Sequence, residues 1–276
     1  MKQFIGFDKE FKDSSIIFFG LPFDGTATFR PGSRFASGVV RNYSEGLETY
    51  SPYQEKDLKE YAICDDGDLE LPFGNVDRSL QIIEQKCTSY LEKGKKILAC
   101  GGEHLVTYPL VKAYLKKYPE LKIIHLDAHT DLREHYLGEK YSHSSVIRLI
   151  AELTNPKNIY QYGIRSGERE EFKWGRENTN FYPFSVNELR NINIDKSVPI
   201  YVTIDLDVLD PAYMPGTGTP EPGGVTFSEL LQAVLYLSGY NIVGADVVEL
   251  APDYDTSGAS TMVAAKIIRE IALVMT

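Results

Sequence analysis

Two hydrophobic patterns alternate along the chain and limit the folds that it can adopt. Near-continuous apolar runs, which are typical of strands buried on both faces, alternate with amphipathic segments that are typical of helices. Strands of that kind occur in parallel sheets covered by helices on both faces, so the alternation predicts an α/β fold. The predicted strands span residues 15–20, 96–100, 122–127, 159–164, 200–205 and 241–250, with weaker candidates at 61–65 and 181–185.

Helix and loop signals agree with that fold. Thr226 is a predicted N-cap, with Glu229 in the capping-box position of the helix that follows. Two long polar segments, 129–145 and 210–224, predict functional loops rather than elements of the core. No internal repeat or low-complexity linker interrupts the pattern, so residues 1–276 are expected to form a single domain. Helical patterns span 76–94, 226–239 and 258–275.

Composition narrows the classes of function. The formal net charge is −10 and basic residues are not clustered, which argues against binding to nucleic acid. No apolar run approaches the roughly 18 residues of a membrane span, and the first residues lack the apolar core of a secretory signal. The odd number of cysteines, without a CxxC pair, favours reduced thiols. We therefore expect a cytoplasmic protein without a nucleic-acid or membrane partner.

Imidazole and carboxylate side chains gather directly after three predicted strands. The sequence DAHTD at 127–131 places ligand-type residues at a spacing of two, and DLD at 205–207 repeats this spacing. Residues two apart in an extended segment point the same way, and the carboxyl ends of parallel strands meet at one edge of the sheet. The candidate metal ligands are His104, Asp127, His129, Asp131, Asp205 and Asp207.

A metal centre explains this gathering better than separate structural roles do. One Asp at a strand end is most often a helix cap or a turn residue, and one His is usually a satisfied polar group. Four carboxylates at one edge, however, repel one another unless a cation compensates them. Mixed imidazole and carboxylate ligands suit manganese, iron, nickel or zinc, and a set of this size suits two ions that share carboxylates.

The same residues resemble the signature motifs of a known family. GGEH at 101–104, DAHTD at 127–131 and TIDLDVLDPAYMPGTGTPEPGG at 203–224 are similar to the motifs of the ureohydrolases, which include arginase and agmatinase. The similarity extends to 20–41 and 244–252, and so covers nearly the whole chain. The resemblance implies a three-layer α/β/α fold with a mainly parallel eight-stranded sheet, and assembly as a homotrimer or homohexamer.

The resemblance also implies a cofactor and a reaction. Each subunit would hold two Mn²⁺ ions, and a hydroxide that bridges them would attack the guanidinium carbon of the substrate to give urea and an amine. Asp127 and Asp205 would bridge the ions. The implied ligands are His104, Asp127, Asp131 and Asp205 for the first ion, and Asp127, His129, Asp205 and Asp207 for the second.

Four residues would then act on the substrate. Glu249 matches the family residue that binds the guanidinium, which needs a carboxylate for paired hydrogen bonds. Asp207 would pass a proton to the leaving amine, with His143 as its acid–base partner and as a substrate contact. Glu168 occupies roughly the position that meets the far end of the substrate, although GEREEF around it is equally typical of a helix start.

The loop at 132–145 bears on which guanidino compound is cleaved. It lacks the donor-rich pattern of arginases and resembles that of agmatinases, so the expected substrate is agmatine and the products are putrescine and urea. Its acids and tyrosines suit a small cationic guanidino substrate. Guanidinobutyrate, arginine and formiminoglutamate are the alternatives, and their carboxylate would need a cation such as Arg133 or Arg165.

Two other classes of protein fit the sequence less well. A dinuclear phosphoesterase would place Lys or Arg near the metals, whereas the motif-bearing loops are acidic; a non-catalytic metal-binding protein would have lost a ligand, and none is lost.

Four further residues near the motifs have expected roles. Glu103 replaces a smaller family residue and should act only indirectly, His125 should be a core histidine, His135 a surface residue and Asp210 a turn residue.

Overall fold

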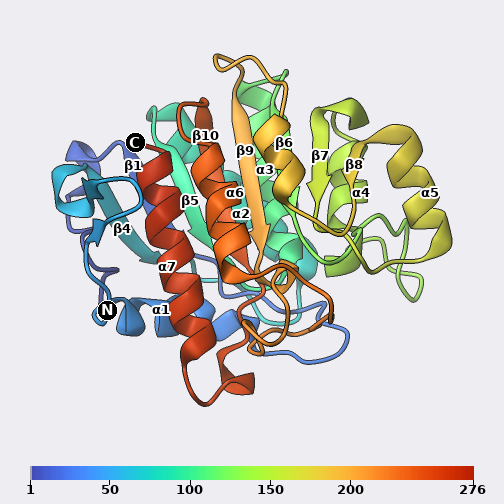
Figure 1. Cartoon of the computed structure of the whole chain (residues 1–276), viewed down its shortest axis with the longest axis horizontal. Helices are drawn as coiled ribbons and strands as arrows, with labels where there is room; N and C mark the ends of the chain where they lie inside the picture. Colours follow the sequence, from blue (N-terminus) through green and yellow to red (C-terminus); the bar gives the residue numbers. More distant parts are fainter. Residues whose placement is uncertain (1) are drawn as a thin grey trace.

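A computed structural model describes residues 2–276, and an eight-stranded sheet runs through its centre (Figure 1). Neighbouring strands are parallel throughout, in the order β4-β1-β5-β10-β9-β6-β7-β8. The predicted α/β/α fold with a mainly parallel eight-stranded sheet is therefore confirmed. The strands are β1 (Ile16–Gly20), β4 (Ile63–Asp68), β5 (Lys96–Cys100), β6 (Lys122–Leu126), β7 (Ile159–Tyr162), β8 (Asn180–Tyr182), β9 (Ile200–Asp205) and β10 (Ile242–Val248).

The two weaker strand candidates form the edges of this sheet. The run at 61–65 overlaps β4, and the run at 181–185 overlaps β8. An edge strand has only one neighbour, and all of the β8 residues stay half-buried, which explains their weak apolar pattern. A separate antiparallel pair joins β2 (Tyr50–Ser51) to β3 (Lys56–Asp57).

Helices cover both faces of the sheet (Figure 1). Successive residues of a strand point to opposite faces, so Ile16 and Phe18 of β1 pack in one core, whereas Ile17 and Phe19 pack in the other. Burial on both sides is the physical reason for the near-continuous apolar runs. The first core is completed by α1 (Ala36–Ser44), α6 (Phe227–Tyr236) and α7 (Ala259–Val274), the second by α2 (Val76–Glu92), α3 (Thr107–Lys117) and α4 (Val146–Ala151), and α5 (Arg169–Asn178) packs beside β8.

Local signals at the helix ends match the predicted elements. The side chain of Asn75 accepts a hydrogen bond from Arg78 N at 2.9 Å and so caps α2. Gly94 follows that helix with a φ of +73°, a conformation that favours glycine. Thr226 and Glu229 form the predicted capping box at the start of α6.

The strand order decides where the functional loops meet. β5, β6, β9 and β10 are not all consecutive in the chain, yet they are neighbours in the centre of the sheet, in the order β5-β10-β9-β6. Their carboxyl ends therefore lie side by side, at the edge where the loop after β9 is seen in Figure 1. Open parallel sheets bind ligands at this edge. Within residues 2–276, none of the helices combines the length and the apolarity needed to cross a membrane.

Candidate metal centre and active site

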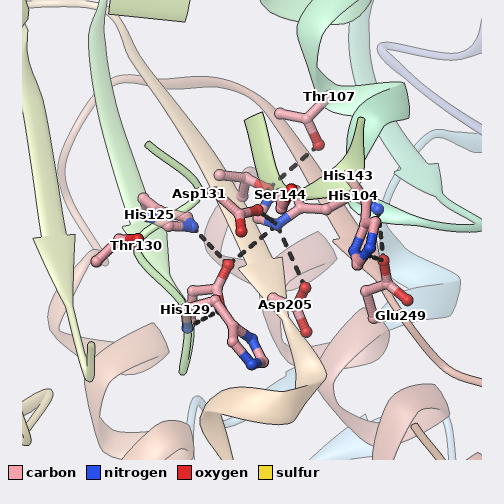
Figure 2. Close-up of polar contacts among 12 residues, drawn as sticks. His104, Thr107, His125, His129, Thr130, Asp131, His143, Ser144, Asp205 and Glu249 are labelled. Carbon is pink, nitrogen blue, oxygen red and sulfur yellow. Dashed lines mark hydrogen bonds and ion pairs between the residues drawn. The ribbon is translucent and has the colours of Figure 1, made fainter. Parts of the chain in front are cut away.

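The first group of predicted ligands surrounds His104, which follows β5 (Figure 2). Its Nδ1 lies 3.0 Å from Asp127 Oδ2, which follows β6. It lies 3.2 Å from Asp131 Oδ2 and 3.2 Å from Asp205 Oδ2, the latter at the end of β9. The turn that delivers His104 requires a glycine, because a Cβ on Gly102 would lie only 1.8 Å from the carbonyl oxygen of Phe23.

The second group lies beside the first and shares Asp127 with it. His129 Nδ1 lies 3.0 Å from Asp207 Oδ2 and 3.5 Å from Asp127 Oδ1. The two oxygens of Asp127 thus face different groups. Asp205 also has two functions: its Oδ1 accepts a hydrogen bond from Asp207 N at 2.9 Å and caps the short turn after β9, while its Oδ2 faces His104. The six side chains converge as the spacing of the motifs predicts.

These residues fit divalent cations. Among the residues that the structure describes, the buried Nδ1 of His104 has no hydrogen-bond partner, although three carboxylates lie within 3.2 Å of it. The Nε2 atom on the other side of the ring lies 2.9 Å from the hydroxyl of Thr203. A ring nitrogen aimed into a buried cluster of carboxylates is the arrangement of a metal-bound imidazole, and clustered buried carboxylates need a compensating charge.

The protonation of these ligands in the absence of a cation also supports a metal site. Burial and the charge of Asp127 raise the pKa of Asp131 to about 7. Burial, Asp207 and Asp127 raise the pKa of Asp205 well above its usual range. Burial opposes the imidazolium form of His104, but the neighbouring carboxylates outweigh it and raise the pKa of His104 well above its usual range. The cluster therefore holds protons that a cation would displace.

Two of the residues at this site have a left-handed backbone. Asp131 has a φ of +50° and Glu249, which follows β10, has a φ of +65°. Such conformations cost about 1–3 kcal/mol for residues other than glycine and persist where the surrounding structure holds them. Glu249 is held on both sides, because its N–H donates to Gly102 O at 2.9 Å and its Oε1 accepts from His104 N at 2.8 Å.

His143 faces Glu249 from the loop after β6 (Figure 2). Its Nδ1 lies 4.0 Å from Glu249 Oε1, and its Nε2 lies 2.9 Å from the hydroxyl of Thr28. Burial and the charge of His129 lower the pKa of His143 to about 4, so the ring is neutral near neutral pH. Burial and Glu103 raise the pKa of Glu249 well above its usual range, which indicates a carboxylate without a cationic partner in the protein alone.

A cavity of about 290 Å³ opens beside these groups. At its outer side, Glu168 Oε1 lies 3.3 Å from a guanidinium nitrogen of Arg133, whose guanidinium carbon lies 5.1 Å from the centre of the Tyr136 ring. Glu168 also begins α5 as the predicted helix start, and it forms a capping box with Glu171. The cavity is lined by Thr28, His129, Thr130, Asp131, Arg133, Tyr136, His143, Ser144, Ser166, Gly167, Glu168, Glu171 and Thr219.

The structure also places the other polar residues near the motifs. His135 is exposed, and Asp210 accepts hydrogen bonds from Ala212 N in its own turn and from Gly223 N and Gly224 N at the other end of the loop. Glu103 is buried and accepts a hydrogen bond from Thr26 N at 2.9 Å, and the hydroxyl of Thr26 in turn accepts one from His143 N at 3.0 Å. The prediction that Arg165 could pair with a substrate carboxylate is wrong. Its guanidinium donates to backbone carbonyls, including that of Asp207 at 2.8 Å, and has a structural role.

His125 contacts a ligand, which the sequence did not predict, and further polar residues that the sequence did not indicate lie behind the ligands. His125 is fully buried, as expected of a core histidine, but its Nε2 lies 2.7 Å from Asp127 Oδ2. Thr203, which contacts His104, donates its hydroxyl to the buried Asp246 at 2.6 Å. Isolated Thr and Asp residues in apolar strands carry no spacing signal, and the contacts of Thr28 depend on a loop far away in the chain.

Comparisons with known proteins agree with this fold and site. The family model described as the arginase family matches residues 14–274. An agmatinase from Bacillus subtilis is 51% identical over 277 residues, and one from Bacillus anthracis is 50% identical; each match covers 99% of this chain and 96% of the relative. The crystal structure of a candidate agmatinase from Clostridium difficile superposes with a TM-score of 0.94, at 47% identity, over 96% of this chain and 98% of that chain.

The fold is a parallel α/β sheet, and imidazoles and carboxylates gather at the ends of its central strands. The family model matches almost the whole chain, so the chain belongs to the arginase family. Within that family it is an agmatinase-like amidinohydrolase, an enzyme that cleaves carbon–nitrogen bonds of guanidino or amidino groups.

Proposed function

We propose that this enzyme hydrolyses agmatine to putrescine and urea at a pair of Mn²⁺ ions. The observation that carries the proposal is the arrangement of two imidazole–carboxylate groups that share Asp127 and adjoin the buried carboxylate of Glu249. The shared groups suit two cations, and the nearby carboxylate suits the guanidinium of a substrate. The agmatinases that match almost the full chain at 50% and 51% identity support agmatine as that substrate.

The chemistry of the donors supports a pair of ions such as manganese. Nitrogen and oxygen ligands without thiolate suit Mn²⁺, with nickel, iron and zinc as the alternatives. When bound, the ions would supply a nucleophile at neutral pH by lowering the pKa of a water molecule. The first ion would be held by His104, Asp127, Asp131 and Asp205, and the second by Asp127, His129, Asp205 and Asp207.

Glu249 would orient the reacting carbon. Its Oε1 is already engaged by His104 N, so Oε2 is the oxygen that can pair with a guanidinium N–H. A cationic substrate would also supply the positive charge that this buried carboxylate lacks, and would lower its raised pKa. A charge-assisted hydrogen bond of this kind would hold the planar guanidinium beside the proposed ligands.

Asp207 and His143 would handle the proton of the reaction. Asp207 Oδ2 lies beside His129 and accepts a hydrogen bond from the hydroxyl of Thr219 at 3.3 Å, and both of these neighbours line the cavity where water and substrate would meet. It would take the proton of the attacking water and pass it to the leaving amine. His143, which is neutral near neutral pH, would relay that proton from Asp207 to the leaving amine.

Glu168 would meet the ammonium end of agmatine. Its side chain is exposed at the outer side of the cavity, where one of its oxygens faces Arg133. Arg133 also supports the alternative substrate, guanidinobutyrate, because its guanidinium could pair with the carboxylate of that substrate. The nearby carboxylates of Glu168 and Glu171 outnumber the single guanidinium, so the balance of charge favours a cationic end.

We infer that the enzyme works in the cytoplasm as a homotrimer or homohexamer. Its three cysteines are buried and free, which suits a reducing compartment. Large apolar side chains such as Phe29, Phe73, Leu137 and Phe184 are more than three-fifths exposed in the single chain, and contact with further copies would cover them.

A substrate panel tests the proposed function. Urea release would be measured with agmatine, arginine and guanidinobutyrate, each with the manganese-loaded and the chelator-treated enzyme. The proposal expects the highest kcat/KM for agmatine and no turnover after chelation. Preference for a carboxylate-bearing substrate would reassign the substrate to the alternative, and unchanged turnover after chelation would refute the metal centre.

A further inference from the structure

We propose that His125 is a positioning residue that makes Asp127 a ligand shared by two cations, rather than a core histidine or a ligand itself. The inference rests on the proposed two-ion function and extends it to a residue behind the metal centre. The evidence is a buried chain of hydrogen bonds that runs from Gln161 on β7 through His125 on β6 to Asp127. All of these side chains are fully buried.

The first step is the orientation of the Gln161 amide. Its Nε2 lies 2.9 Å from the carbonyl oxygen of Thr130, which can only accept a hydrogen bond. The NH₂ group is therefore on this side, and its second hydrogen points toward His125 Nδ1 at 3.2 Å. The carbonyl of the amide accepts from the hydroxyl of Thr179 at 3.2 Å, which agrees with this orientation.

The second step is the tautomer of His125. Because Nδ1 accepts from Gln161, the hydrogen of a neutral ring is on Nε2. This N–H donates to Asp127 Oδ2 at 2.7 Å. His125 lies close enough to His104, Asp127 and Asp131 to be considered a metal ligand. However, one of its ring nitrogens faces Gln161 and the other carries a hydrogen, so it has no lone pair for a cation.

The third step is the effect on Asp127. Its Oδ1 accepts a hydrogen bond from His129 N at 2.5 Å, and its Oδ2 accepts from His125. With one donor on each oxygen, the carboxylate is locked in rotation. Its remaining lone pairs then point apart, with Oδ2 3.0 Å from His104 Nδ1 and Oδ1 3.5 Å from His129 Nδ1. Without His125, the carboxylate could turn and offer both oxygens to one cation.

Two amide substitutions separate this role from packing. In H125Q the side-chain NH₂ reaches about the position of Nε2 and can still donate to Asp127. In H125N the side chain is one methylene shorter, so its NH₂ ends near the position of Nδ1. Both variants keep a polar amide in the same buried space, and they differ in whether Asp127 retains its donor.

A third variant controls for the loss of buried hydrogen bonds as such. The hydroxyl of Tyr114 on α3 donates to Val243 O at 2.9 Å and accepts from Ile97 N at 3.1 Å, away from the ligands. Y114F should lower the melting temperature without changing metal binding. Q161L gives a second route to the same question, because it leaves His125 in place but removes the donor that fixes its tautomer.

The test is manganese binding to the full-length enzyme, measured by titration with electron paramagnetic resonance. Wild type, H125Q and Y114F should bind two ions per chain and give the signal of a spin-coupled pair. In H125N the affinity for the weaker ion should fall by roughly 10–100-fold, the usual effect of removing a group that orients a ligand, and the bound manganese should give the signal of isolated ions. Q161L should show the same change to a smaller extent.

The outcomes separate this inference from the proposed function. If H125N and Q161L bind two ions as tightly as wild type, His125 only packs in the core and the inference is overturned. If wild type itself binds fewer than two ions, the proposed function fails at its metal centre, and the inference that depends on it fails too. Equal losses in H125N and H125Q would show that His125 acts through something other than its Nε2–H, and would also overturn the inference.

Discussion

The substitution E249Q offers a quantitative test of substrate recognition. Glu249 is almost completely buried and nearly isosteric with Gln, so packing should be preserved. The structure decides how the amide will settle. His104 N donates to Oε1 at 2.8 Å, and only a carbonyl oxygen can remain there, so the NH₂ group must replace Oε2. That position is the one proposed to face the guanidinium, which offers donors only.

The magnitude follows from the bond that is lost. A hydrogen bond to a charged group contributes about 1.5–3 kcal/mol, and the new NH₂ group adds a donor that opposes another donor. Since 1.36 kcal/mol corresponds to a factor of ten in rate, kcat/KM for agmatine should fall roughly tenfold to more than a hundredfold. Manganese content should stay at the wild-type value, because Glu249 is not among the proposed ligands.

The assay is urea release under kcat/KM conditions, with the metal content measured in parallel. E249D serves as a matched control, because it keeps the charge but withdraws it from the position proposed for the guanidinium. A wild-type kcat/KM in E249Q, at full metal content, would refute the reasoning and would direct attention to Glu168 as the carboxylate that binds the guanidinium.

Four further predictions follow from the same geometry. T203V removes the acceptor for His104 Nε2–H and should lower manganese affinity roughly 10–100-fold, whereas T203S should retain it; equal affinities would show that the contact is dispensable. Manganese should raise the melting temperature and a chelator should reverse the rise, and no shift at saturating metal would count against an assembled site. The pKa of Asp131 is raised to about 7, so its protonation stabilises the metal-free protein at low pH, and this contribution is lost as the pH rises from about 4 through 7. The gain in melting temperature on adding manganese should therefore be larger at pH 8 than at pH 5. The opposite trend would contradict the buried cluster. E168Q should lower kcat/KM for agmatine more than for guanidinobutyrate, and an equal loss for both would show that Glu168 does not contact the variable end of the substrate.

The candidate ligands could be predicted from the sequence because local geometry determines their placement. In DAHTD a spacing of two at a strand end aims alternate side chains at one place, whatever the rest of the chain does. The convergence of three such segments also follows, because parallel strands end at a common edge. The order of the central strands does not follow from these patterns. It places β10, and with it Glu249, between the strands that carry His104 and Asp205.

The residues behind the ligands could not be predicted, because their roles depend on contacts across the sheet. Gln161 acts on Asp127 through His125, from the next strand over, and Asp246 supports His104 through Thr203. Each is an isolated polar residue in an apolar run, and its partners are far away in the sequence. Arg165 shows the reverse error. A cation near a motif suggests a ligand for substrate, but its guanidinium is occupied by backbone carbonyls.

In the proposed enzyme, the two imidazole–carboxylate groups hold a pair of cations through the shared Asp127. Crystals grown with manganese, measured at the manganese absorption edge, test it most directly. Two anomalous peaks are expected about 3.5–4 Å apart, one beside His104 and one beside His129, with an oxygen of Asp127 next to each. A single peak, or peaks away from these residues, would contradict it.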